Sequence, residues 1–146
     1  MNPLASLTHV DRMDTATWSN IVSALADKED VDTCVAAAAR LHKDATSEDI
    51  PALLELLRRG DFFEREAAAW PLAELSGPAH LQELFDAYQR GFDEGHDNDG
   101  FTAALLEIPA RYPDDARAAL TALVGEAGEP TRGHAAWLLE FCESAN

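Results

Sequence analysis

Residues 65–72 read REAAAWPL, and residues 132–139 read RGHAAWLL. The arginine, two alanines, the tryptophan and the last leucine are identical in the two segments, which start 67 residues apart. Midway between them, residues 102–105 read TAAL, again two alanines followed by a large apolar residue. This spacing predicts an internal repeat with a unit of about 33 residues, the length range typical of stacked helical repeats.

The sequence between and around these segments predicts helices. Apolar residues recur every three or four positions, as Leu53, Leu54 and Leu57 do, and such spacing lines one helix face. Glycine and proline at Gly60 and Gly77-Pro78 indicate helix ends. Signals for β-strands are nearly absent. The expected helices are 14–26 (or from residue 15), 30–43, 48–59, 63–75, 79–90, 100–111, 114–124 and 131–142.

Each helical pair has an apolar face that it cannot bury alone, and the alanine steps allow helices to approach closely. We therefore expect an all-α fold, an α-solenoid of about four helical pairs in a right-handed superhelical stack. Pro71 and Pro109 fall inside expected helices, where proline introduces a kink. We expect one domain over 1–146, comprising an N-terminal arm at 1–13, a helical pair at 14–43, and repeats at 47–76, 78–112 and 114–143.

The best-formed unit combines DIPALLELL at residues 49–57 with Asp61, Arg65 and the pair Ala68-Ala69. This pattern resembles a HEAT repeat, especially the short type of bilin-lyase-like proteins. The resemblance implies an aspartate between the two helices and an arginine that packs against the neighbouring repeat. Asp61 and Arg65 fit those two places. Arg132 fits the arginine in a later unit, whereas the middle unit lacks it.

Three tryptophans and two cysteines are candidate core residues. Trp70 and Trp137 occupy equivalent places in the repeated segments, and Trp18 lies in an amphipathic helix, so we expect all three in the core. Cys34 and Cys142 sit among apolar residues, and we interpret them as small buried side chains in a reducing cytoplasm. A disulfide between them stays open, because nothing in the sequence requires it.

The chain of 146 residues carries 27 acidic and 11 basic residues, a net charge of −16. This charge argues against nucleic-acid binding and against docking on anionic lipid, since both depend on lysine and arginine. It favours a basic protein partner. Without a secretory signal or an apolar membrane-spanning stretch, we expect a cytoplasmic protein. Nine arginines against two lysines, with abundant alanine, are typical of GC-rich bacterial genomes.

An acidic segment, residues 91–99, separates two expected helices by a longer linker than elsewhere. It is not an EF-hand, because the register that fits Gly100 places Gly95 and Leu106 where calcium ligands must stand. A solvated acidic turn and a contact loop both stay open. In the second interpretation Phe92 or Phe101 is an apolar anchor. The expected partner-binding residues are Phe92, Asp93, Glu94, His96, Asp97, Asp99 and Phe101.

No spacing typical of catalysis or metal binding occurs, so we expect no catalytic residues, no metal and no cofactor. HEAT-like proteins include inhibitors, and the acidity fits a basic target. The leading hypothesis is therefore a protein-binding solenoid, not an enzyme, that acts as an acidic immunity or inhibitor protein against a basic toxin or effector enzyme. The resemblance also leaves open a lyase or isomerase subunit, or a general adaptor scaffold. The oligomeric state stays open as well.

Overall fold

The computed structural model describes residues 13–144, and all of its regular elements are helical, which confirms the all-α prediction. The expected arm at 1–13 lies, apart from Met13, outside the described residues. Two short 3-10 turns occupy Ser47–Asp49 and Gly77–His80. The α-helices are α2 (Thr15–Leu25), α3 (Val31–Asp44), α4 (Ile50–Arg59), α5 (Phe62–Ser76), α6 (Leu81–Asp93), α7 (Asp99–Arg111), α8 (Pro113–Glu126) and α9 (Thr131–Ser144).

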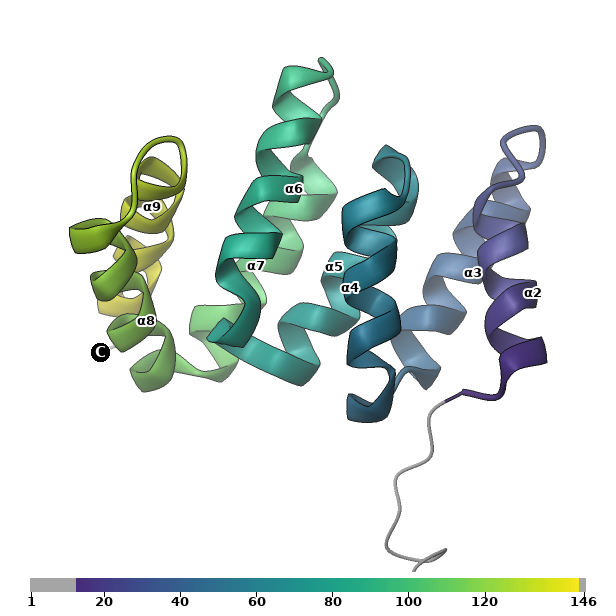
Figure 1. The fold of residues 1–146 in the computed structure, drawn as a ribbon, viewed down its shortest axis with the longest axis horizontal. Helices are drawn as coiled ribbons and strands as arrows, with labels where there is room; N and C mark the ends of the chain where they lie inside the picture. Colours follow the sequence, from purple (N-terminus) through teal and green to yellow (C-terminus); the bar gives the residue numbers. More distant parts are fainter. Residues whose placement is uncertain (1–12, 145–146) are drawn as a thin grey trace, which may run out of the picture.

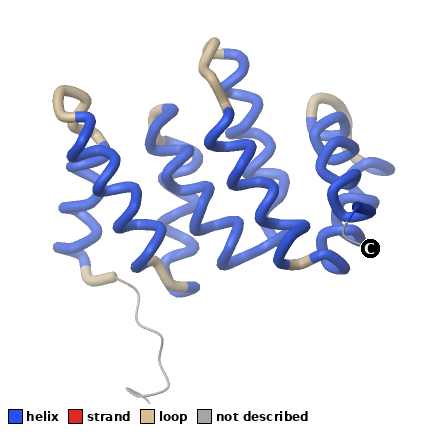
Figure 2. Tube along the Cα trace, turned by 180° about the vertical axis from the view of Figure 1, so that it is seen from behind, coloured by secondary structure: helices blue, strands red, loops and turns tan. Residues whose placement is uncertain are grey.

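The helices stand side by side in two layers (Figure 1). In that view α2, α4, α6 and α8 lie in front and α3, α5, α7 and α9 behind; Figure 2 shows the same row from the rear. Helix α2 packs on α3, α4 on α5 and α8 on α9, while α3, α5, α7 and α9 contact one another in succession. The front helices connect to the rear helices along the upper edge of Figure 1, which we call the loop edge.

Aspartates fix where several helices begin. The Asp30 carboxylate accepts the backbone N–H of Thr33 at 3.1 Å, and Asp61 accepts that of Glu64 at 2.9 Å. Glu64 returns the contact by accepting the N–H of Asp61 at 3.0 Å, which completes a capping box. Because these caps depend only on nearby residues, the first residue of each such helix can be predicted closely from the sequence.

Helix α5 lies near the centre of the row, and part of its buried face consists of alanines. Ala68 and Ala69 are fully buried, and α5 contacts α3, α4 and α7. The helix continues through buried Pro71, as α7 continues through Pro109. The Trp70 ring, next to these alanines, is partly buried and packs against the core.

The other core candidates lie largely inside. Trp18 and Trp137 are partly buried and pack against the core. Cys34 and Cys142 are buried and not joined by a disulfide, so the interpretation of both as buried side chains is confirmed. In the described part of the chain, no helix combines the length and the apolar character needed to cross a membrane.

The predicted bounds of the linker, residues 91 and 99, are both wrong. Helix α6 extends to Asp93, and α7 begins at Asp99, which leaves only 94–98 as a loop. The Asn98 side chain returns across the turn and fills the space beside helical Gly91. A Cβ added at Gly91 would lie 2.3 Å from Asn98 Oδ1. Asn98 Nδ2 also donates to the carbonyl oxygen of Tyr88 at 2.8 Å, so the glycine permits a turn-closing contact.

We predict opposite effects for two glycine-to-alanine substitutions. Gly91→Ala should lower the free energy of unfolding by about 1–3 kcal/mol, because the new methyl group displaces Asn98. Gly125→Ala in α8 should raise it by about 0.5–1 kcal/mol, because alanine favours the helix and a Cβ there meets nothing within 4 Å. Urea unfolding measures both. Equal stability of the two variants would show that the Asn98 side chain does not depend on the absence of a Cβ at Gly91.

Candidate functional site

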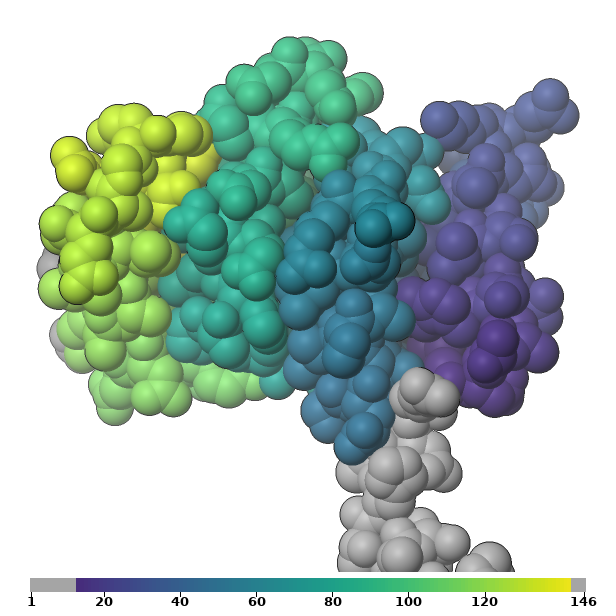
Figure 3. Space-filling view, in the orientation of Figure 1, coloured from purple at the N-terminus to yellow at the C-terminus, as the bar shows by residue number. Residues whose placement is uncertain are grey.

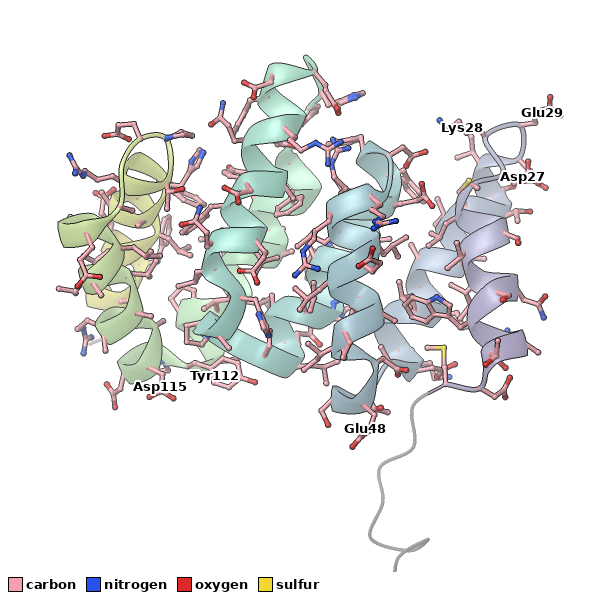
Figure 4. All side chains as sticks on the ribbon, viewed as in Figure 1. Asp27, Lys28, Glu29, Glu48, Tyr112 and Asp115 are labelled. Atoms are coloured by element: carbon pink, nitrogen blue, oxygen red, sulfur yellow. The ribbon has the colours of Figure 1, made fainter. Side chains whose placement is uncertain are left out.

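Side-chain contacts join successive connections along the loop edge. Lys28 Nζ, from the α2–α3 loop, lies 3.1 Å from Asp61 Oδ2 at the start of α5. Arg90 Nη1 of α6 donates to the carbonyl oxygen of Arg58 in α4 at 2.8 Å. Figure 4 shows Asp27, Lys28 and Glu29 at the tip of the first loop. The connections involved are residues 26–30, 60–61 and 94–98.

Arg65 provides the central link. It lies in the first turn of α5, and only 1% of its surface is exposed. Its Nη1 donates to the carbonyl oxygen of Gly60 at 3.1 Å, and its Nη2 donates to Glu94 Oε1 at 2.5 Å. Its Nε has no hydrogen-bond partner among the described residues. The bond from Arg65 is the main cause that lowers the pKa of Glu94, so this carboxylate stays charged at neutral pH.

The repeated arginine makes a repeated contact. Arg132 Nε donates to the carbonyl oxygen of Ala127 at 3.0 Å, five residues back, as Arg65 does to Gly60. Arg132 is exposed, however, because no described helix follows α9 to cover it. The two arginines thus share this local contact and differ in burial.

An apolar pocket of about 350 Å³ opens on the loop edge beside the Lys28–Asp61 ion pair. The space-filling view shows the α2–α3 loop projecting at this part of the loop edge (Figure 3). Val31, at one wall, is 69% exposed although it is apolar. The walls consist of apolar Leu25, Val31, Cys34, Phe62 and Phe63, together with Lys28, Asp61 and His96.

Three aspartates lie near the wall of this pocket that Cys34 forms. Burial raises the pKa of the Cys34 thiol, and Asp27, Asp30 and Asp61 raise it further. The thiol donates to the carbonyl oxygen of Asp27 at 2.8 Å. Cys34 is therefore protonated at neutral pH and is a wall of the pocket, not a nucleophile.

Asp61 stays anionic beside the pocket. Partial burial raises the pKa of its carboxyl, but the hydrogen bond from the Glu64 N–H and the Lys28 ammonium outweigh burial, so the pKa lies below its usual value. Its Lys28 partner is 74% exposed. Exposed ion pairs of this kind are weak, so the lysine can leave without disturbing the cap.

His96 forms the far wall. Its ring stacks on Phe62, with centroids 4.2 Å apart and planes inclined by 17°. Its Nε2 lies 3.6 Å from Glu94 Oε1, the oxygen that Arg65 also holds. The Arg65–Glu94 contact thus positions both the loop and the ring that closes this side of the pocket.

Six of the seven residues expected to bind a partner are exposed at this edge, namely Phe92, Asp93, Glu94, His96, Asp97 and Asp99. Phe101 is the exception and needs correction. It is 1% exposed and packs in the core, with its ring 5.4 Å from that of Tyr88. Phe101 therefore does not anchor a partner.

Sequence reasoning missed the pocket. Its walls come from segments far apart in the chain, and Lys28, Val31 and Phe62 only meet through stacking of the helices. One signal was present, because Val31 and Val35 stand outside the buried stripe of α3, which contains Cys34, Ala37 and Leu41. An exposed apolar pair of this kind indicates a contact surface.

A second apolar surface lies between α6 and α9. Phe92 is 47% exposed and stacks on His134 at 6.2 Å, and Phe141 is 41% exposed and meets Trp137 edge-on at 5.5 Å. Burial lowers the pKa of His134, so its ring is neutral at pH 7 and packs as one more aromatic group.

The described residues contain no group of three His, Cys, Asp or Glu side chains that could hold a metal ion. Glu66 has a raised pKa, because of burial and the nearby Asp97, but it does not line the pocket. The arrangement can bind by charge and by apolar contact. No family model, curated protein or solved structure matches the chain.

We predict unequal costs for losing the two repeated arginines. Arg65→Met should lower the free energy of unfolding by about 2–4 kcal/mol, because it removes the main partner of Glu94 and a buried hydrogen-bond donor. Arg132→Met should cost less than about 1 kcal/mol, because that side chain is exposed. Urea unfolding of both variants measures the difference. Equal losses would contradict the assigned role of Arg65.

Proposed function

We propose that this chain is a protein-binding α-solenoid built from about four HEAT-like helical pairs in a right-handed stack. Three observations support the proposal. The helices stand in two layers with successive contacts along the rear layer. Asp61 caps its helix where a HEAT-like aspartate belongs. Arg65 reaches the next loop, and Arg132 repeats its contact with the preceding loop.

The proposed binding surface is the loop edge, and its proposed partner is a basic protein. The observation that carries this proposal is an apolar pocket set among exposed acids. A partner can bury an apolar side chain against the apolar walls. The acidic side chains of the edge favour lysine- and arginine-rich surfaces and increase their association rate. Exposed acids of this edge include Asp27, Glu29, Asp30, Asp93, Glu94, Asp97 and Asp99, and the exposed cations Lys28, Arg58, Arg59 and Arg90 lie at the same edge.

The more specific proposal is an immunity or inhibitor protein that neutralises a basic toxin or effector enzyme. An enzyme that acts on nucleic acid binds phosphates through a basic groove. Carboxylates at Asp93, Asp97 and Asp99 would occupy the positions of those phosphates. The adaptor alternative uses the same surface and differs in the consequence of binding, because an adaptor leaves its partner active.

The test is capture of partners from the source cells with tagged protein, at low and at moderate salt. The test variant carries Asp93→Asn, Asp97→Asn and Asp99→Asn, and it spares Glu94 because Arg65 depends on it. A control with the same charge change carries Glu48→Gln, Asp114→Asn and Asp115→Asn. Figure 4 shows Glu48 and Asp115 at the edge opposite the loop edge.

We expect the unmodified protein and the control to capture one basic partner in stoichiometric amount. The loop variant should associate about three- to tenfold more slowly, because rim charges act mainly on the association rate. Loss of the captured partner's activity would support the inhibitor proposal, and retained activity would favour the adaptor. Equal association rates of the two variants would contradict binding at the loop edge.

A further inference from the structure

We propose that the loop-edge pocket receives one apolar side chain from a lysine- or arginine-bearing segment of the partner, while a neighbouring cation of that segment replaces Lys28 on Asp61. This inference rests on the proposed function and specifies how the loop edge recognises its partner. In this proposal Lys28 pairs with Asp61 in the free protein, and the partner's cation takes that place in the complex.

The apolar half of the proposal follows from the pocket. Its volume of about 350 Å³ is at the lower end of the usual range for ligand sites, about 300–1,000 Å³. Leu25 closes the inner wall and is 1% exposed, whereas Val31 at the mouth is 69% exposed. Such a pocket suits a single large side chain, and its entry removes the exposed Val31 surface from water.

The cationic half follows from Asp61. Its carboxylate has one oxygen on the Glu64 N–H and the other on Lys28, so the helix cap holds it in place whether or not Lys28 is present. Lys28 is 74% exposed, and the residues on either side of it, Asp27 and Glu29, are acidic. A second cation can therefore take its place with little loss.

Asp61 joins the two halves, because it both binds Lys28 and lines the pocket. The opposite wall is held by the stack of His96 on Phe62 and by the Arg65–Glu94 contact. The geometry thus accepts two adjacent side chains, one apolar and one basic. A purely basic segment leaves the pocket empty, and an acidic segment meets Asp27 and Asp61.

The test uses the full chain and three short peptides with blocked ends. The first peptide has a leucine flanked by two lysines on each side. The second replaces the leucine by glycine, and the third replaces the lysines by glutamates. Methyl NMR of Leu25 and Val31 reports entry into the pocket. We expect saturable shifts with the first peptide, binding at least about tenfold weaker with the second, and no shifts with the third.

The two lysines of the chain provide a matched pair of variants. Lys28→Met should raise the affinity for the first peptide by about two- to fivefold, because the peptide no longer competes with an exposed ion pair. Lys43→Met changes the net charge equally at a distant exposed position and should leave the affinity unchanged. Asp61→Asn keeps a good helix cap and should weaken binding.

Absence of shifts at Leu25 and Val31, or equal effects of the two lysine variants, would overturn this inference. The proposed function would survive that result if partner capture still depended on Asp93, Asp97 and Asp99. Conversely, specific peptide binding without capture of any basic partner would support the pocket assignment and count against the proposed function.

Discussion

The loop edge depends on the contacts of one buried guanidinium group, which needs hydrogen-bond acceptors and an opposite charge close to it. Arg65 is 1% exposed, so an unpaired charge there would be costly. It takes one partner from its own loop, the Gly60 carbonyl, and one from the next loop, Glu94. Both loops therefore hold a fixed spacing. His96, two residues after Glu94, is brought onto Phe62, and the pocket between the first three connections acquires its far wall.

Much of the fold could be predicted because its determinants are local. Caps such as Asp30 and Asp61 act on residues three positions ahead, and the apolar stripes repeat every three or four residues. The helix bounds consequently agree with the expected ranges to within a few residues. Gly91 shows the opposite case. The helix continues past the expected end at residue 90, and Asn98 folds back over this glycine in a contact that no local pattern reveals.

The candidate site could be predicted only in part, for the same reason. Acids clustered between residues 93 and 99 are visible in sequence, and the structure exposes them. Phe101 was misplaced because an aromatic residue beside acids fits an anchor and a core position equally well, and only packing on Tyr88 decides. The pocket was missed because stacking brings Val31 and His96 together from separate helical pairs.

The central claim is that the Arg65–Glu94 contact couples neighbouring loops, and a double-mutant cycle tests it most directly. Free energies of unfolding would be measured for the unmodified protein, Arg65→Met, Glu94→Gln and the double variant. We predict a coupling energy of about 1–3 kcal/mol, because each side chain is the other's main charged partner. A coupling energy near zero would contradict the account, since the two loops would then be held in place without this contact.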